Sequence, residues 1–394
     1  MKIAFFVSLK ETGGALNQTK GFISKINKIK FKSKDKLYII SDNKIGIDQL
    51  KFNNIEILYF KKNFINKIYF FLIGFLTNNE FFLFKFLNSF EIFLKKNKID
   101  LLIFSNPSYY SNYCKNINYV INIWNTEIGN FKSFIEFKNS GYQYQKKIIQ
   151  TSVENAFKLV VFTKQNQIDL INQFNCNPKN ISIQNLSPFL PEKIKEFKNI
   201  DFYEIFSKFN FEKNKKWFFY PAQFWSHKNH VYLLNVMKIL INHKNENIGF
   251  IFCGGDKGNS SYIKNRIIDL KLENNIQVLG HVSDEELISL YKHSEGLVNP
   301  TYLGRSSLPL LEAIYFNKKI FYSKNILDES LKPYVVEFDL TNPNDLVKKI
   351  IEYIENSQKV NLNYDEINSD LSFVETYKKI IDEFRLYLNT WKTD

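Results

Sequence analysis

Cysteine is scarce in this chain of 394 residues, which has only three. Cys114, Cys176 and Cys253 lie far apart in the sequence and show no metal-ligand spacing. The sequence therefore indicates neither a disulfide framework nor a zinc site, and it favours a reducing, cytoplasmic compartment.

Arginine is equally rare, although the chain is basic. Of the 53 basic side chains, all are lysines except Arg266, Arg305 and Arg385. The formal net charge of +13 favours an anionic partner, such as nucleic acid, an acidic membrane surface or a phosphorylated small molecule. Nucleic acid is disfavoured, because the lysines are interleaved with acidic residues and no recognised nucleic-acid-binding module is present.

Long apolar runs are also missing. The apolar start of the chain ends at Val7, too early for a signal-peptide core. The strongest apolar stretch, 68–76, falls short of the ~20 residues that span a bilayer, so no transmembrane helix is predicted. The aromatic segment 64–94 contains interspersed lysines and leaves two interpretations open. It is typical either of core-facing helices or of a surface that lies against an anionic membrane.

What the chain does have is a regular alternation of short apolar runs with longer periodic segments. The first six runs predict strands at 2–8, 37–42, 55–60, 100–105, 119–124 and 158–163, with helices such as 14–28 and 142–157 between them. After the polar stretch 185–215, strands are predicted at 217–222, 248–253, 276–279, 296–300, 319–322 and 335–339. The helices between them are predicted near 228–242, 259–270, 284–293, 306–316 and 343–356. This alternation indicates parallel sheets that are covered on both faces.

The sequence thus predicts an α/β protein with two Rossmann-like lobes that face each other across a cleft. We expect an N-terminal lobe at 1–190, an interlobe linker at 191–215, a C-terminal lobe at 216–365 and a C-terminal helix in 366–394 that returns toward the first lobe. Sheets of this kind bind ligands at the carboxyl ends of their strands. The residues that follow each strand are therefore the candidate site residues.

Glycine-rich turns follow two of the predicted strands. Gly13 and Gly14 lead from the first strand into a helix, where close backbone approach and helix-terminal amides favour an anion. Gly254 lies in a similar turn after the strand at 248–253. Neither turn has the full G-x-G-x-x-G pattern, so a dinucleotide site is disfavoured.

The second lobe opens with a strand end and a loop that carries two histidines and a lysine. Lys228 lies between His227 and His230, near the predicted start of a helix, where it can neutralise a diphosphate. The histidine pair could suggest a metal, but no carboxylate or cysteine lies next to it in the sequence. Anion binding is the favoured interpretation.

Two later stretches have the same strand, turn and helix pattern. In the first, His281 and Val282 precede Ser283 and Glu286, which form a capping-box pattern; His281 could equally be a loop histidine without chemistry. The second runs from Asn299 through Tyr302, Gly304 and Arg305 to a helix start with Ser306, Ser307, Leu308 and Pro309. Within that helix Glu312 lies on an apolar stripe, where a carboxylate needs a hydrogen-bond partner. A sugar or ribose diol would supply one, and so would a group within the lobe.

Three of these stretches, in this order and spacing, resemble the second domain of a GT-B glycosyltransferase of the large retaining family four, the glycosyl transferases group 1. They are Tyr-Pro-Ala-Gln-Phe-Trp-Ser-His-Lys-Asn-His from Tyr220, Leu-Gly-x-Val-x-Asp-x-Glu-Leu from Leu279, and Gly-x-x-x-Leu-Pro-x-x-Glu-Ala from Gly304. The resemblance is strong over about 216–325 and looser elsewhere. In the first lobe, Asn125 and Glu127 lie where relatives carry a Trp-Asp pattern.

The resemblance implies roles for individual residues. Glu312 matches a glutamate that binds the ribose of a nucleotide sugar, and Lys228 matches a lysine that contacts the donor diphosphate. Residues 280–282 fall where relatives touch the nucleobase. Two positions depart from the pattern: Gly304 stands where relatives carry a first glutamate that holds sugar hydroxyls, and Gln223 stands where they carry a diphosphate-binding arginine. We hypothesise that Arg305 takes over the phosphate contact.

The expected activity is transfer of a sugar from a nucleotide-diphosphate sugar to an acceptor hydroxyl, with retention and without a metal or other cofactor. The expected acceptor is a glycan or a lipid-linked glycan, as in surface polysaccharide or lipopolysaccharide synthesis. Two other interpretations stay open: an inactive GT-B scaffold subunit, and a nucleotide-sugar epimerase on the same fold. The catalytic candidates are Lys228, Arg305 and Glu312. The substrate-binding candidates are Gly13, Gly14, Asn125, Glu127, Gln223, Gly254, His281, Val282, Tyr302, Gly304, Ser306, Ser307 and Leu308.

Overall fold

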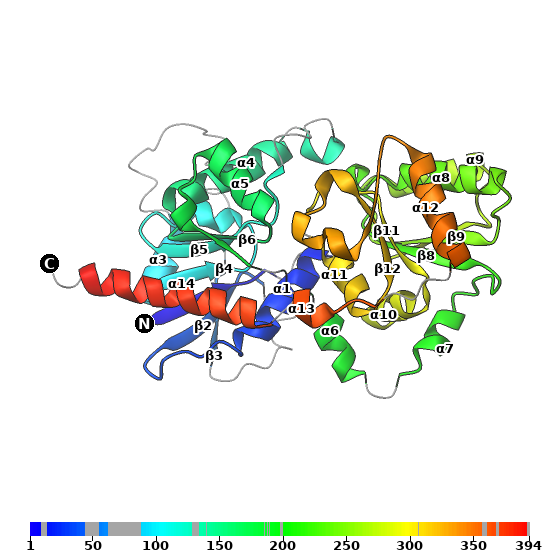
Figure 1. The fold of residues 1–394 in the computed structure, drawn as a ribbon. Coiled ribbons are helices and arrows are strands. Elements are labelled where there is room, and N and C mark those ends of the chain that lie inside the picture. The colour runs from blue at the N-terminus through cyan, green and yellow to red at the C-terminus, as the bar shows by residue number, and fades with distance from the viewer. Residues whose placement is uncertain are drawn as a thin grey trace. The chain divides into compact units, whose positions relative to one another are not determined.

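The computed structural model divides the chain into two compact units. It describes residues 1–8, 14–43, 55–61, 88–127, 134–138, 140–184, 186, 188, 190–197, 200–305, 307–356, 361–367 and 370–391. Unit 1 comprises 1–128, 140–184 and 370–394, and unit 2 comprises 129–139 and 185–369 (Figure 1). Each unit therefore contains segments from both halves of the chain.

Unit 1 is built on a parallel sheet of seven described strands in the order β3-β2-β1-β4-β5-β6-β7. The strands are β1 (Lys2–Phe6), β2 (Lys36–Ser41), β3 (Ile55–Tyr59), β4 (Leu101–Phe104), β5 (Asn118–Asn122), β6 (Lys158–Val161) and β7 (Ile181–Ile183). Strand β1 pairs with β2 and β4, so that Phe5 lies beside both Ile39 and Ile103. The six strands predicted from apolar runs are confirmed, and β7 is an additional one.

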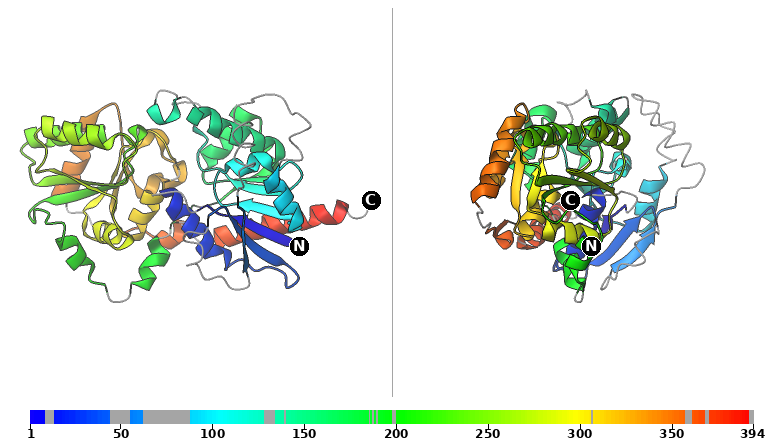
Figure 2. Two further views of the ribbon diagram at one scale, coloured as in Figure 1. Left: turned by 180° about the vertical axis from the view of Figure 1, so that it is seen from behind. Right: turned by 90° about the vertical axis from the view of Figure 1, so that its right-hand side faces the viewer.

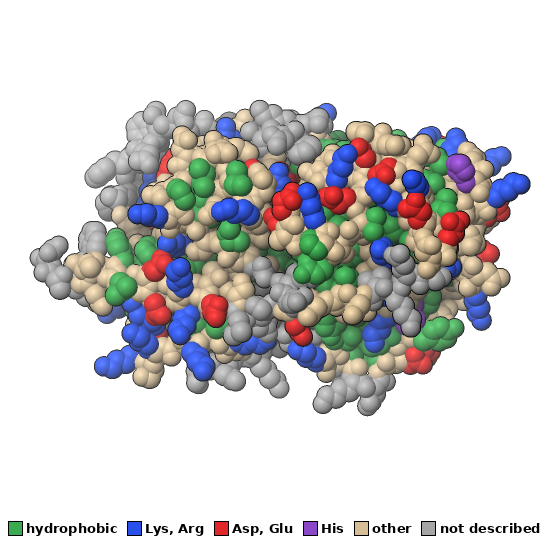
Figure 3. Space-filling model, in the orientation of Figure 1, with side chains coloured by type: hydrophobic (Ala, Val, Ile, Leu, Met, Phe, Trp, Pro, Cys, Tyr) green, Lys and Arg blue, Asp and Glu red, His purple; other side chains and the backbone are tan. Residues whose placement is uncertain are grey.

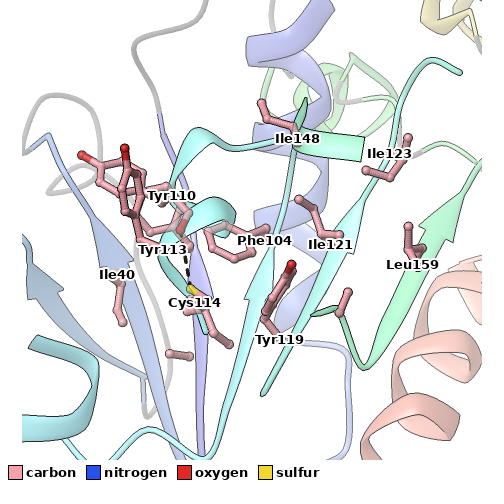
Figure 4. Packing of buried hydrophobic residues seen from close by; sticks show 14 of the residues in the cluster. Ile40, Phe104, Tyr110, Tyr113, Cys114, Tyr119, Ile121, Ile123, Ile148 and Leu159 are labelled. Atoms are coloured by element: carbon pink, nitrogen blue, oxygen red, sulfur yellow. Dashed lines mark hydrogen bonds between the residues drawn. The ribbon is translucent and has the colours of Figure 1, made fainter. Parts of the chain in front are cut away.

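Helices cover both faces of this sheet, as the two views in Figure 2 show. They are α1 (Gly14–Ile26), α3 (Ser89–Lys96), α4 (Ser140–Asn155), α5 (Lys164–Phe174) and α14 (Asp370–Trp391), with short 3-10 turns η2 (Tyr109–Tyr113) and η5 (Pro178–Asn180). One face carries a core that includes Phe104, Tyr119 and Ile148, together with Cys114, whose thiol donates to the Tyr110 carbonyl (Figure 4). All three cysteines are buried, and none forms a disulfide.

The C-terminal helix α14 completes the opposite face of unit 1. Phe373, Tyr377 and Phe384 share a core with Phe22 of α1 and with β1. The Tyr377 hydroxyl donates to Asn122 Oδ1 at 2.7 Å, at the end of β5. Near the other end of the helix, the Arg385 guanidinium pairs with Asp35. A helix that lies more than 200 residues away in the sequence therefore covers one face of the N-terminal sheet.

Unit 2 is built on a second parallel sheet, in the order β10-β9-β8-β11-β12-β13. The strands are β8 (Lys216–Pro221), β9 (Ile248–Cys253), β10 (Ile276–Gly280), β11 (Gly296–Asn299), β12 (Lys319–Ser323) and β13 (Val336–Phe338). Alternate side chains of β8 face opposite sides, because successive strand residues point to opposite faces of a sheet. Phe218 packs with Phe321 and Tyr353, whereas the Phe219 ring lies edge-on to Tyr291.

The helices of unit 2 connect these strands. They are α6 (Leu190–Lys193), α7 (Phe202–Ser207), α8 (His230–Asn242), α9 (Ser260–Asp269), α10 (Asp284–His293), α11 (Leu308–Tyr315), α12 (Pro343–Asn356) and α13 (Tyr364–Ile367). Short 3-10 turns occur at η4 (Ile135–Phe137), η6 (Ile194–Glu196), η7 (Ser226–Lys228), η8 (Lys324–Ile326) and η9 (Glu329–Tyr334). Helices α8, α9 and α12 bury Leu233, Ile263 and Ile350 in one core against β8 and β9.

The predicted extents of the N-terminal lobe, 1–190, and of the linker, 191–215, differ from the structure, because unit 2 includes 129–139 and begins again at residue 185. Residues 191–215, expected to form a linker, belong to unit 2, where α7 packs on α10 and the Ser289 hydroxyl donates to the Phe202 carbonyl. Segment 134–138 also belongs to unit 2, although it lies between β5 and α4 in the chain and within the predicted N-terminal lobe. Neither 191–215 nor 134–138 is rich in glycine and serine, so its composition does not mark a domain boundary.

The described surface mixes charges of both signs. On the face in Figure 3, lysine and arginine side chains lie among acidic ones in both units. Among the described helices, none is both long and apolar enough to cross a membrane. Of the aromatic segment 64–94, residues 64–87 lie outside the described part of the chain, and Phe90 and Leu94 of α3 are buried in unit 1.

Candidate functional site

Two loops at the carboxyl ends of neighbouring strands are joined in unit 2. The first follows β8 and contains η7, and the second connects β11 to α11. The His227 carbonyl accepts hydrogen bonds from the Tyr302 amide at 2.9 Å and the Thr301 hydroxyl at 3.3 Å. The Asn229 side chain donates to the Pro300 carbonyl at 3.2 Å. These bonds hold the two loops together, and the Lys228 ammonium group lies close to Gly304.

Gly304 leaves space in front of the Lys228 ammonium group. A Cβ atom built on Gly304 would lie 3.8 Å from Lys228 Nζ, and no other described residue beyond its chain neighbours comes within 4 Å of it. The φ angle of Gly304 is +98°, a conformation that side chains rarely adopt. The Gly304 carbonyl accepts from the Tyr322 hydroxyl at 3.3 Å, and the Lys228 carbonyl accepts from Tyr220 at 2.8 Å. Both backbones are thus fixed by buried tyrosines.

The start of α11 lies immediately beyond Gly304 and the half-buried Arg305. Ser307 occupies the N-cap position, as expected, but its side chain makes no capping bond and instead accepts from Asn299 Nδ2 at 3.3 Å. Leu308 is buried, whereas Ser306 lies outside the described residues. Pro309 has no backbone N–H, so the early donors of α11 that the Ser307 side chain leaves to other acceptors are the Leu308 and Leu310 amides.

Glu312 lies one turn into α11 and is only 3% exposed. The Tyr291 hydroxyl of α10 donates to its Oε2 at 2.8 Å. Burial raises the pKa of Glu312 to about 7, against the opposing effect of the Tyr291 hydrogen bond. The hydrogen-bond partner that this carboxylate requires is therefore supplied within the unit.

A third loop, at the end of β9, approaches the β8 loop closely. A Cβ on Gly254, whose φ is +155°, would lie 2.3 Å from the Ala222 carbonyl oxygen, so only glycine fits there. The Gly254 amide donates to the Gly280 carbonyl at the end of β10. The next residue, His281, is exposed and Val282 is half-buried.

The predicted capping box at the start of α10 is confirmed. The Ser283 amide donates to Glu286 at 2.7 Å, and the Glu286 amide donates back to the Ser283 hydroxyl at 3.2 Å.

Gln223, which stands where the family pattern carries an arginine, accepts from the Trp225 indole at 3.0 Å. Lys257 lies over the same indole, 5.6 Å from its ring centre.

The two histidines beside Lys228 have different surroundings. His230 is fully buried between the rings of Phe224, Tyr220 and Phe252, and burial lowers its pKa to about 3. Within the described part of the chain, no group of three or more His, Cys, Asp or Glu side chains could hold a metal ion.

His227 contacts a carboxylate that the sequence does not single out. Glu136 of η4 forms hydrogen bonds with the His227 ring and with the Ser226 hydroxyl, and it accepts from the His227 amide at 2.9 Å. Burial raises the pKa of Glu136, but these hydrogen bonds outweigh it and lower the pKa to about 2. Burial lowers the pKa of His227 to about 4, although Glu136 opposes that shift. Because Glu136 lies about ninety residues before the loop, no local spacing in the sequence points to it.

The candidates from the first lobe lie in unit 1. Asn125 is half-buried and accepts from the amide of the buried Glu127 at 2.9 Å. Between them, the Thr126 hydroxyl donates to Asp169 at 2.8 Å within a buried polar network that also includes Asn166. Gly14 is the exposed first residue of α1, and Gly13 lies outside the described residues.

Comparison with known protein families finds a match for the part of the chain that contains the two joined loops. Residues 201–368 match the model of the family described as glycosyl transferases group 1. This segment is similar to the domain of the group 1 glycosyltransferases. It contains the two joined loops, with Lys228, Gly304 and Glu312. A comparison with curated protein sequences finds no significant match.

Solved structures resemble the whole chain. Sucrose-phosphate synthase from Thermosynechococcus elongatus matches with a TM-score of 0.69 and 12% identity, covering 100% of both chains. Anabaena Alr3699/HepE in complex with UDP matches with a TM-score of 0.61 and 12% identity, again over 100% of both chains. WaaG, a glycosyltransferase involved in lipopolysaccharide biosynthesis, matches with a TM-score of 0.63 and 13% identity over 93% of this chain and 100% of its own. The fold is therefore GT-B, with two Rossmann-like lobes, as the sequence predicts.

Proposed function

We propose that this glycosyltransferase transfers a sugar from a nucleotide-diphosphate sugar to an acceptor hydroxyl, with retention at the anomeric carbon. The observation that carries the proposal is the position of the Lys228 ammonium beside Gly304, just before the start of α11. A positive charge and the amides at a helix start favour a diphosphate at the same place. That HepE has been solved with UDP and with UDP-glucose supports a donor of this class.

The proposed chemistry is electrostatic. As the bond between the sugar and the diphosphate breaks, negative charge grows on the departing phosphate oxygen. Lys228, the first amides of α11 and Arg305 stabilise that charge, so the proposal requires no metal ion or other cofactor. Glu312 is proposed to bind the donor ribose, and residues 280–282, which include His281 and Val282, the nucleobase. The departing phosphate itself takes the proton of the acceptor hydroxyl.

The proposed acceptor is a glycan or a lipid-linked glycan in surface polysaccharide or lipopolysaccharide synthesis. The similarity to WaaG, which is involved in lipopolysaccharide biosynthesis, supports this choice. Asn125 and Glu127 of unit 1 are the proposed acceptor-side residues. We further propose that the protein works in the cytoplasm, at the inner face of the membrane. Co-sedimentation with anionic vesicles at low and high salt tests this location, and failure to bind at low salt contradicts it.

Mass spectrometry of the purified protein with nucleotide sugars and lipid-linked oligosaccharides tests the activity. The expected result is a glycosylated acceptor with the anomeric configuration of the donor, formed by the wild type and lost in Lys228→Ala. Lys238→Ala is the matched control, because Lys238 is exposed on α8 of the same unit. Donor binding without turnover would instead support a scaffold subunit, and a changed sugar formed without acceptor would support an epimerase.

A further inference from the structure

Glu136 contacts the loop that carries Lys228 through three donors at once. Its Oε1 accepts from the His227 amide at 2.9 Å and lies within hydrogen-bond reach of His227 Nδ1, while its Oε2 accepts from the Ser226 hydroxyl. The Glu136 side chain is 5% exposed and the His227 side chain is 12% exposed. Three hydrogen bonds fix the orientation of this buried carboxylate, and the carboxylate in turn fixes the positions of Ser226 and His227.

The hydrogen-bond pattern also fixes the state of the His227 ring. An ionised carboxylate can only accept hydrogen bonds, so Nδ1 must carry the proton in the neutral ring. The ring and the backbone of His227 are therefore tied to the same group. Since Lys228 is the next residue, the direction in which its side chain leaves the backbone depends on this anchor.

The same segment reaches the second loop of the site. The Phe134 ring lies 5.5 Å from the Tyr302 ring and 6.3 Å from the His227 ring. The Tyr302 amide donates to the His227 carbonyl, so the two loops and the segment 134–138 contact one another pairwise. The Tyr220 hydroxyl also donates to the Lys228 carbonyl at 2.8 Å. The backbone at 227–228 is thus anchored from three elements.

We propose that Glu136 is a positioning residue, which orients Lys228 toward the diphosphate of the donor by clamping Ser226 and His227. This inference rests on the proposed function, because it assigns to Glu136 a part in binding that donor. Glu136 itself needs no contact with the donor. Its loss would leave the nucleoside part of the site intact and misplace the ammonium group, and small misplacements of a charged group weaken its interactions strongly.

Isothermal titration calorimetry with a nucleoside diphosphate and its parent nucleoside tests the proposal. UDP, GDP and ADP are titrated against the wild type, and the tightest is carried forward with its nucleoside. Glu136→Gln should weaken diphosphate binding about tenfold, as expected for loss of charge-assisted hydrogen bonds, and change nucleoside binding less than about twofold. Glu329→Gln, at an exposed glutamate of the same unit, should change neither.

Ser226→Ala gives a second, milder test that removes a single donor to Glu136. It should weaken diphosphate binding more than nucleoside binding, and it decides the matter if Glu136→Gln does not fold. Equal weakening of both ligands in these variants would show a general structural role and overturn the inference.

Lys228→Ala separates the inference from the proposed function. If Lys228→Ala weakens diphosphate binding while a folded Glu136→Gln binds like the wild type, the proposed function stands and the positioning role is wrong. If the wild type binds no nucleoside diphosphate, or if Lys228→Ala binds as tightly as the wild type, the proposed function fails and the inference with it.

Discussion

The ammonium nitrogen of Lys228 lies 3.8 Å from the point that a Cβ atom on Gly304 would occupy. A carboxylate introduced at that point would form an ion pair with Lys228 and compete with the donor diphosphate. We therefore expect Gly304→Asp to weaken nucleoside diphosphate binding about tenfold, in line with the worth of a partly buried ion pair. Calorimetric titration measures the change.

Gly258→Asp is the matched control for this substitution. Gly258 has a φ of +96°, close to the +98° of Gly304, and among the described residues beyond its chain neighbours none comes within 4 Å of its Cβ position. Both variants should lose about 1–2 kcal/mol of stability through backbone strain. Equal diphosphate affinities in the two variants would contradict the assignment of Lys228.

The pH dependence of stability should report the buried carboxyl of Glu312. Its pKa is raised from 4.5 to about 7 in the folded protein, so the unfolded chain releases this proton first as the pH rises. Folding therefore loses stability between about pH 4.5 and 7, by roughly 3 kcal/mol if the group remains fully buried. We expect the melting temperature of Glu312→Gln, relative to wild type, to be higher at pH 8 than at pH 5.

Differential scanning calorimetry at these two pH values checks this prediction. Glu273→Gln, at an exposed glutamate of unit 2, is the control and should show no such trend. If the melting temperature of Glu312→Gln differs from that of wild type by the same amount at both pH values, the carboxyl of Glu312 titrates normally.

His230 should make the protein sensitive to acid. Its pKa is lowered to about 3, below the 6.5 of an exposed histidine, because it is buried among aromatic rings. The unfolded chain then binds a proton that the folded protein refuses, so its contribution to stability is complete above about pH 6.5 and falls as the pH drops toward 3. Between pH 7 and 4.5, His230→Phe should lose less stability than wild type, by about 2–3 kcal/mol.

Urea unfolding at pH 7 and pH 4.5 measures this difference. The exposed His243 provides the control variant His243→Phe, which should lose as much stability as wild type over this range. Parallel losses in His230→Phe and wild type would mean that His230 is protonated in the fold.

The C-terminal helix should be essential to unit 1. Tyr377→Phe removes the 2.7 Å bond to Asn122 and leaves a buried amide oxygen without this donor, which costs about 1–3 kcal/mol. Tyr203→Phe, at an exposed tyrosine of α7, should cost much less. Chemical unfolding monitored by circular dichroism compares them, and similar midpoints for both variants would contradict the role of α14 in closing this sheet.

Local patterns in the sequence predict most of the fold. Apart from β7, which is not predicted, the strands of both sheets begin and end within about two residues of their predicted bounds, because apolar runs and turn residues are local signals. The capping box of Ser283 and Glu286 is predicted for the same reason. The join between the Lys228 loop and the Gly304 loop depends on the pairing of β8 with β11, a strand order that the local patterns do not predict.

Contacts between distant segments could not be predicted in this way. The insertion of Glu136 beside His227 joins residues about ninety positions apart, and Tyr291 meets Glu312 through helix packing. The assignment of 191–215 to unit 2 likewise depends on α7 packing against α10. Ser307 is a residue type that commonly caps helices, but its hydroxyl accepts a hydrogen bond from the Asn299 side chain instead of capping α11. Each of these depends on tertiary neighbours that the local sequence does not reveal.

The most direct test of the central claim is the stoichiometry of the reaction. With donor and acceptor present, nucleoside diphosphate release and glycosylated acceptor are quantified together by chromatography and mass spectrometry. The account predicts that the wild type forms them in equal amounts, and that Lys228→Ala forms neither at a comparable rate. Nucleoside diphosphate release that occurs without glycosylated product, or full activity in Lys228→Ala, would contradict it.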